Sequence, residues 1–140
     1  MAEVEGYHHV SLSVSDLGRS TEWYRRTLGF EIESEIEGDA FRRTRLRAGS
    51  GLTLTLTAHE QQPGEPFDER RAGVDHIAFD VGSAGAVQGL KDRFEELGVV
   101  HSNVKQAASG SAMITLRDPD NLQLEVFGGT FDSRIAAGRE

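Results

Sequence analysis

The sequence predicts an α+β fold built from two βαβββ units. Three observations support this prediction: the two halves of the chain resemble each other, their strand-like segments alternate apolar and polar residues, and a helix-like segment follows the first strand of each half. The chain has 140 residues, which suits one compact domain or two very small halves sharing a core.

The first half opens with "GYHHVSLSV" from Gly6, which alternates like a half-buried strand. Ser15 or Asp16 can cap the helix that follows, and Gly29 can end it. Next comes "FEIESEIEGD", which could form a row of cation-binding glutamates, although a charged edge strand that resists edge-to-edge pairing fits the pattern better. The half closes with "FRRTRLR" and "LRAGSGLTLTL", which complete the strands.

The second half repeats this order. "GVDHIAFDV" from Gly73 matches the first strand, Ser83 can cap a helix that Gly98 ends, and "LRDPDNLQLEV" matches "LRAGSGLTLTL" as strand, tight turn and strand. We therefore expect a first unit over 1–58, a linker over 59–72, a second unit over 73–128 and a tail over 129–140. Gly51 and Asn121 share the turn position where a positive φ is expected.

Alternation divides each predicted sheet into an apolar face and a mixed face. The apolar face should form the core against the helices, and its residues are Val10, Leu12, Val14, Leu52, Leu54, Leu56, Ile77, Phe79, Val81, Leu122, Leu124 and Val126. The mixed face carries His9, Ser11, Ser13, Thr53, Thr55, Thr57, His76, Ala78, Asp80, Gln123, Glu125 and Phe127. By parity His8 falls on the apolar side, so only His9 has a counterpart, in His76.

Composition excludes several classes of function. The formal charge of -8 and a pI near 5.1 argue against nucleic acid or an anionic membrane as the main partner, because both need a basic surface. The absence of cysteine excludes disulfides and thiolate chemistry. No apolar run approaches the roughly 20 residues that span a bilayer. We expect a cytoplasmic protein that acts on a small molecule.

Three residues of the mixed face have side chains suited to a divalent metal: His9, His76 and Glu125. Two neutral imidazoles and one carboxylate can hold a metal while leaving positions open for water and substrate. Taken singly, each of these residues also fits a structural or solvated strand position.

The segments "HHVSLSVSDLGRSTEWYRRTLGF", "GVDHIAFDV" and "LRDPDNLQLEVF" resemble the vicinal oxygen chelate superfamily, which includes glyoxalase I, bleomycin-resistance proteins and extradiol dioxygenases. The resemblance implies paired βαβββ units, with helices outside and sheets curled around a cavity that contains one divalent metal (Mn, Fe, Ni or Zn). It implies that His9, His76 and Glu125 bind this metal. Thr55 stands where four-ligand members such as glyoxalase I have a carboxylate, so glyoxalase I activity itself is not expected. Members of this size commonly form homodimers.

Several substrates and functions remain open. The resemblance to fosfomycin thiol transferases places Ser11, Lys105, Ser109 and Arg134 at substrate-binding positions, with Thr115 in place of an expected tyrosine. An alternative for Lys105, Ser109 and Arg134 is a surface loop and a charged tail. An extradiol dioxygenase or a ligand-binding protein without catalysis are further alternatives. No catalytic acid or base is identified.

A row of arginines on one predicted strand also has two interpretations. Arg43, Arg45 and Arg47 share one face and could clamp an anionic substrate, or they could form a solvated or ion-paired strand surface.

Overall fold

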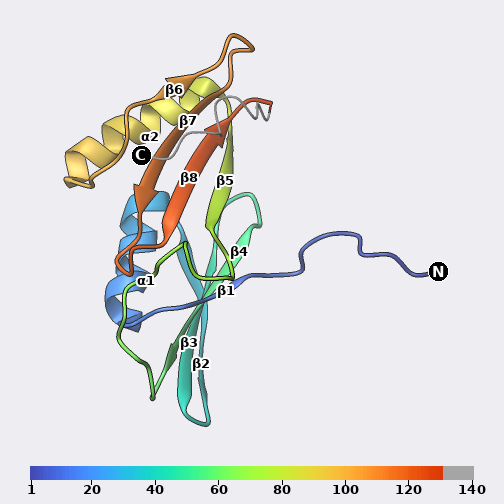
Figure 1. Ribbon diagram of the computed structural model, residues 1–140, viewed down its shortest axis with the longest axis vertical. Helices are drawn as coiled ribbons and strands as arrows, with labels where there is room; N and C mark the ends of the chain where they lie inside the picture. The colour runs from blue at the N-terminus through green and yellow to red at the C-terminus, as the bar shows by residue number, and fades with distance from the viewer. Residues whose placement is uncertain (131–140) are drawn as a thin grey trace. The chain divides into compact units, whose positions relative to one another are not determined.

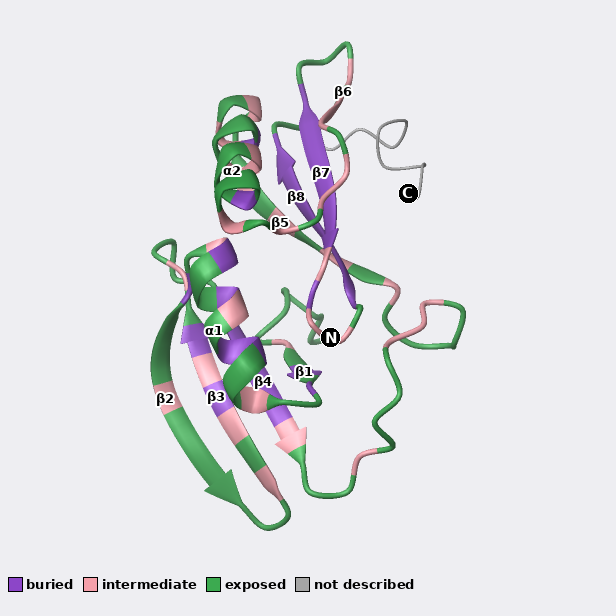
Figure 2. Cartoon of the chain, turned by 90° about the vertical axis from the view of Figure 1, so that its left-hand side faces the viewer, coloured by how far each residue is buried: buried purple, intermediate pink, exposed green. Residues whose placement is uncertain are grey.

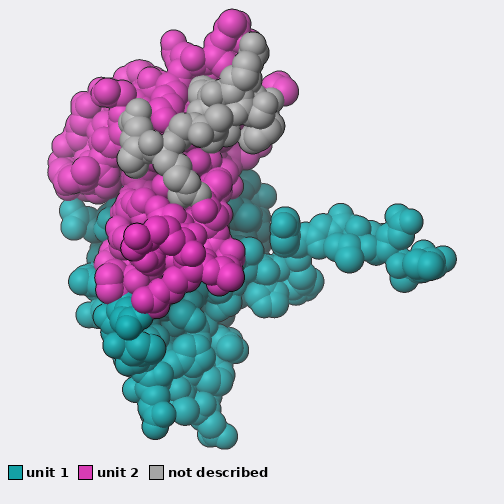
Figure 3. All heavy atoms as spheres, viewed as in Figure 1, with its two compact units in different colours: residues 1–65 teal, residues 66–140 magenta. Residues whose placement is uncertain are grey.

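A computed structural model of the chain describes residues 1–130. The structure divides into two compact units, residues 1–65 and residues 66–140, coloured separately in Figure 3. The predicted contribution of Arg134 lies outside the described residues.

The first unit contains one helix and a four-stranded sheet (Figure 1). Its elements are β1 (Ser11–Ser13), α1 (Leu17–Leu28), β2 (Glu31–Gly38), β3 (Phe41–Arg47) and β4 (Thr53–His59). The strand order is β1-β4-β3-β2, with β1 parallel to β4 and the other pairs antiparallel. The first strand of the unit therefore lies directly beside its last.

The ends of α1 have the caps that the sequence predicts. The Asp16 side chain accepts a hydrogen bond from the backbone N–H of Arg19, and Gly29 ends the helix with a φ of 76°. The helix packs on β3 and β4, and its Tyr24 is fully buried. The buried apolar residues of this unit are Leu12, Val14, Tyr24, Phe30, Leu46, Leu54 and Leu56.

Strand β1 is shorter than the alternation predicts. It begins at Ser11, so the prediction that the strand starts at Gly6 is wrong, and the two histidines precede it. Both His8 and His9 are exposed, and their Nδ1 atoms lie 2.9 Å apart. The sequence pattern that predicts a strand extends over the residues before Ser11, but the regular pairing with β4 starts only at Ser11, opposite Thr55.

The second unit repeats the same topology. Its elements are β5 (His76–Gly82), α2 (Ala84–Leu97), β6 (Lys105–Gln106), β7 (Ala112–Arg117) and β8 (Gln123–Gly128). The strand order is β5-β8-β7-β6, and β5 is parallel to β8. Helix α2 starts after the Ser83 cap, ends at Gly98 and packs mainly on β7 and β8.

Burial in the second unit is concentrated on its central strands. Figure 2 shows β7 and β8 almost entirely buried, and their apolar residues include Ile114, Leu116, Leu124 and Val126. The predicted core residues of β5, namely Ile77, Phe79 and Val81, are only half-buried because β5 is an edge strand. Leu52 was also predicted as core, and it is 47% exposed because it precedes the paired part of β4.

The Asp-Pro-Asp turn has a structural role. The Asp118 carboxylate accepts hydrogen bonds from the backbone N–H groups of Asp120 and Leu122, and Asn121 has a φ of 72°. The Asn121 side chain donates to the carbonyl of Phe67 at 2.9 Å. The turn therefore fixes both the β7–β8 connection and the segment that precedes β5. The positive φ expected at Asn121 and Gly51 is confirmed.

The fold-class prediction is confirmed: the chain is α+β, with two βαβββ units whose mixed sheets each carry a helix on one face. Strand β2 is the edge strand that its glutamates indicate. Among the described residues, no helix combines the length and apolar character needed to cross a membrane.

One glycine is required by space. A Cβ on Gly128 would lie 2.1 Å from the carbonyl oxygen of Ser83, so the end of β8 passes against the backbone that caps α2. We expect Gly128→Ala to destabilise the protein by about 1–3 kcal/mol, because that backbone would have to move. The matched control is Gly89→Ala on α2, where a Cβ meets nothing within 4 Å. This control should stabilise the helix by up to about 1 kcal/mol. Urea unfolding measures both, and equal effects of the same sign would contradict the packing argument.

Candidate functional site

The parallel pairing of β5 with β8 brings two predicted site residues together. His76 is the first residue of β5, and Glu125 lies on the neighbouring strand β8. The His76 Nε2 atom is 3.6 Å from a carboxylate oxygen of Glu125. Only 5% of the Glu125 side chain is exposed, against 38% for His76. The second unit therefore places an imidazole nitrogen at the edge of a buried carboxylate.

A second carboxylate orients the imidazole of His76. The Nδ1 atom lies 2.6 Å from a carboxylate oxygen of Asp75, and donates to it when it carries a proton. This contact directs Nε2, the other ring nitrogen, to the side of Glu125. A carboxylate on the outer nitrogen of a histidine is the usual support of a metal-binding imidazole.

The other site residues predicted in the second unit differ in position. Thr115 is buried and lies directly opposite Glu125 in the β7–β8 register, so it shares the Glu125 face. Lys105 begins β6 opposite Met113, on the same face by register. Ser109 is exposed in the β6–β7 turn, where its hydroxyl lies 3.1 Å from that of Ser111.

His9, the third predicted ligand, belongs to the first unit and is exposed beside His8. Across residues 1–130, no three histidine, aspartate or glutamate side chains are grouped so that they could hold a metal ion. The structure therefore brings together two of the three predicted donors, His76 and Glu125.

The mixed face of the first unit carries a network of hydroxyl groups and one arginine. The Ser11 and Thr57 hydroxyls lie 2.8 Å apart, and Arg43 Nε donates to the Thr57 hydroxyl at 3.0 Å. Thr55 is buried on the same face, between Ser11 on β1 and Arg45 on β3. Four residues that the sequence suggests for substrate binding are thus neighbours on this face, namely Ser11, Thr55, Arg43 and Arg45.

Arg45, which the sequence suggests as an anion clamp or as part of an ion-paired strand surface, forms an ion pair. Glu33 binds Arg45 at 2.7 Å and Arg47 at 2.5 Å. The hydrogen bond from Arg47 and the positive charge of both arginines hold the pKa of Glu33 below its ordinary value. These two arginines are therefore already matched with a carboxylate.

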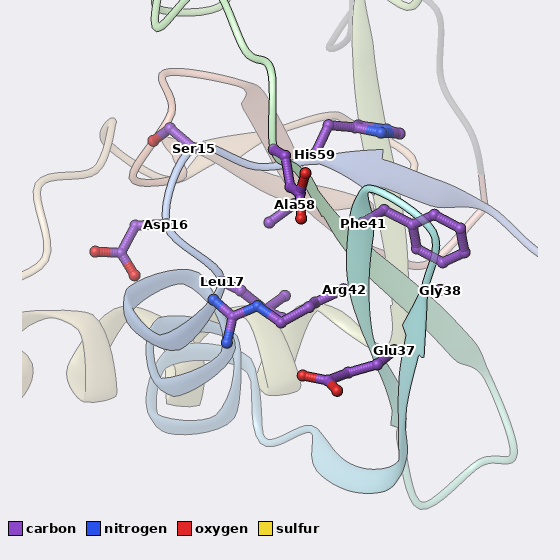
Figure 4. Close-up of a pocket in the computed structure, with 10 residues that line it drawn as sticks. Ser15, Asp16, Leu17, Glu37, Gly38, Phe41, Arg42, Ala58 and His59 are labelled. Carbon is purple, nitrogen blue, oxygen red and sulfur yellow. The ribbon is translucent and has the colours of Figure 1, made fainter.

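The first unit also contains a pocket of about 540 Å³, shown in Figure 4. Its lining comes from the start of α1, the β2–β3 hairpin and the end of β4, and includes Asp16, Glu37, Phe41, Arg42, His59 and Glu60. None of the predicted site residues lines this pocket.

Sequence reasoning missed two supporting residues. Asp75 precedes His76 directly, so the pair could have been noticed as a carboxylate and imidazole in sequence, but its contact depends on the side-chain conformations. Thr57 was placed on the mixed face, but its bond to Arg43 depends on the register of β3 and β4. Register cannot be read from alternation alone.

Comparison with known proteins gives curated relatives over almost the whole chain. The glutathione transferase FosA of Serratia marcescens is 30% identical over 98% of this chain and 90% of the relative. The metallothiol transferase FosB of Staphylococcus haemolyticus is 26% identical over 98% of this chain and 93% of the relative.

A solved structure has the same fold. It is the glyoxylase/bleomycin resistance protein/dioxygenase domain from Frankia sp. EAN1pec, with a TM-score of 0.84 and 30% identity over 91% of this chain and 100% of that one.

The model of one protein family matches residues 6–126, which cover most of both units and include every predicted metal ligand. With the full-length relatives and the shared fold, this match confirms the resemblance seen in the sequence. The chain belongs to the glyoxalase/bleomycin resistance protein/dioxygenase superfamily.

Proposed function

We propose that this protein is an enzyme that uses one divalent metal (Mn, Fe, Ni or Zn) to act on a small substrate with neighbouring oxygen atoms. His76, Glu125 and His9 are the proposed ligands. The observation that carries the proposal is the Glu125 carboxylate, which is buried, faces His76 Nε2 and makes no hydrogen bond to any residue among 1–130.

The cost of burying a charge supports a cation at this position. A buried carboxylate without hydrogen bonds destabilises the folded state by several kcal/mol unless a cation compensates it. Imidazole and carboxylate donors suit all four metals. Asp75, which contacts the outer nitrogen of His76, is the kind of supporting group that metal-binding histidines have.

His9 supplies the third donor in this proposal. His9 is exposed, so its imidazole can take up a metal ion. We also propose that the protein forms a homodimer, as the resemblance to the family implies.

The bound metal would polarise substrate oxygens and stabilise negative charge that develops on them. Thr115 lies directly beside Glu125 and places a hydroxyl at the site, while Lys105 is on the same face. Thr55 occupies the position of the fourth ligand in glyoxalase I and is a poor metal ligand, so we propose a three-ligand site and a reaction other than that of glyoxalase I.

The metal ligands can be tested by elemental analysis. Protein purified without chelators and then loaded with manganese, nickel, zinc or iron should bind about one metal per chain. His9→Ala, His76→Ala and Glu125→Ala should each lower this occupancy strongly, because three donors are few for tight binding. The matched control is His101→Ala, which removes a half-buried histidine of the second unit whose Nδ1 contacts the Ser102 carbonyl. Unchanged occupancy in the Glu125 variant would refute the site, and a protein that binds no metal would favour ligand binding without catalysis.

The supporting role of Asp75 gives a separate prediction. Asp75→Asn should weaken metal affinity about 10- to 100-fold. The neutral amide orients the imidazole of His76 less strongly, and the negative charge that makes this imidazole a better metal ligand is lost. The control is Asp80→Asn at the far end of β5, where the carboxylate accepts a bond from the Gly82 N–H. Competition with a metal-binding dye measures both affinities. Equal affinity of the wild type and the Asp75 variant would show that Asp75 does not support a ligand.

Thiol transfer to fosfomycin is the second candidate function. FosA is similar over almost the entire chain, and Ser11, Lys105 and Ser109 stand at positions that the resemblance assigns to substrate binding. If this candidate is right, the manganese-loaded protein should consume fosfomycin only when glutathione is present, and Lys105→Ala should slow the loss at least about tenfold. Phosphorus NMR follows the substrate directly. No loss of fosfomycin with glutathione and manganese would eliminate this activity and leave the broader proposal standing.

A further inference from the structure

We propose that Arg43 is an anchor for a negatively charged group of the substrate, namely a carboxylate, phosphonate or phosphate. This inference rests on the proposed function and narrows its substrate class, because it requires an anionic group in addition to the metal-chelating oxygens. The anchor is formed by Arg43 with Thr57 and Ser11 on the mixed face of the first unit.

Two contacts hold the guanidinium group of Arg43 in place. Its Nε donates to the Thr57 hydroxyl at 3.0 Å, and the centre of the guanidinium lies 4.2 Å from the centroid of the Phe41 ring. Thr57 is 2% exposed, so the hydrogen bond is formed away from bulk water. A guanidinium fixed in this way loses little further conformational freedom when it binds a ligand.

Arg43 differs from Arg45 and Arg47, the other two arginines of its strand face, in the charges of its neighbours. The register of β2 against β3 shifts between Ile32 and Ser34. Glu33 lies within this shift and binds both Arg45 and Arg47. The cross-strand neighbours of Arg43 are Ile36 and Thr57, neither of which carries a charge. Among residues 1–130, no carboxylate lies within ion-pair distance of Arg43, although the chain as a whole carries a net charge of -8.

The remaining donors of Arg43 suit an oxyanion. Its two terminal nitrogens make no hydrogen bond to the described residues, and together they can bind two oxygens of one carboxylate or phosphonate group. The Thr57 hydroxyl accepts from Arg43, so its own proton is available to Ser11 at 2.8 Å. In that arrangement the Ser11 proton is available to a substrate oxygen.

The position of Ser11 links this anchor to the proposed metal site. Ser11 follows His9 by two residues, which separates their Cα atoms by at most about 7 Å. A small substrate that chelates a metal beside His9 can therefore extend along Ser11 to the guanidinium. Arg43 would determine which substrates bind.

Titration with simple anions tests the anchor without knowledge of the substrate. Methylphosphonate and acetate are titrated into metal-free and manganese-loaded protein, and the Nε–Hε signal of Arg43 is followed by NMR in the metal-free samples. We expect saturable shifts of this signal, and calorimetry should show at least about tenfold weaker methylphosphonate binding in Arg43→Gln. Arg43→Lys should retain part of the affinity, because the charge remains while the two-point hydrogen bonding is lost.

The matched control is Arg42→Gln, which changes the net charge equally. Arg42 precedes Arg43 on β3 and is exposed. In Figure 4 its side chain points toward the start of α1, whereas the Phe41 ring points the other way. Its substitution should leave methylphosphonate binding within about twofold of the wild type, since exposed charges are screened. Equal losses in the two variants, or equal binding by wild type and Arg43→Gln, would overturn the proposal.

The two proposals fail in different ways in this experiment. Loss of metal binding with retained Arg43-dependent anion binding would refute the metal site and leave the anchor. Normal metal occupancy with anion binding that ignores Arg43 would refute the anchor alone. Thermal unfolding of each variant identifies any misfolded protein. Phe41→Leu, which removes the aromatic ring beside the Arg43 guanidinium and leaves its charge and its bond to Thr57, should then weaken methylphosphonate binding by a smaller factor than Arg43→Gln.

Discussion

The parallel pairing of the first strand with the last strand in each unit is the constraint on which the candidate site depends. In the second unit this pairing places His76 beside Glu125, and in the first unit it places Ser11 beside Thr55 and near Thr57. A parallel pair needs a long connection, which the helix and the two intervening strands provide. The helix then covers the apolar face of the sheet, so the polar side chains are left together on the other face.

The register shift in β2 affects how charge is distributed on the mixed face of the first unit. The register shift in β2 is a departure from strict alternation, and Glu33 in this segment neutralises two arginines of β3. Arg43 lies opposite Ile36 and Thr57 and keeps its charge. The register shift in this edge strand thus separates two ion-paired arginines from an arginine whose cross-strand neighbours are uncharged.

The sequence predicts the order of the elements well because its two halves repeat that order and because helix caps are local signals: Asp16, Gly29, Ser83 and Gly98 all occupy the predicted cap positions. Alternation was less reliable at strand ends. It extended β1 over His9, whereas the pairing begins at Ser11, and it placed Leu52 in the core, where it is exposed. The contacts of Arg45 with Glu33 and of His76 with Asp75 depend on register and rotamers, which periodicity does not contain.

Corresponding positions of the repeat carry different chemical groups in the two units. The position of Glu125 in the second unit corresponds to Thr55 in the first, and the cross-strand pair Arg43–Thr57 corresponds to Met113–Phe127. Met113 and Phe127 form a buried apolar cluster, so these two positions of the second unit carry no hydroxyl and no guanidinium. Glu125 thus has a neutral counterpart in the first unit, and Arg43 has a neutral counterpart in the second. If Arg43 anchors the substrate as proposed, the substrate carries an anionic group in addition to its chelating oxygens, whereas a neutral substrate would leave Arg43 without a function.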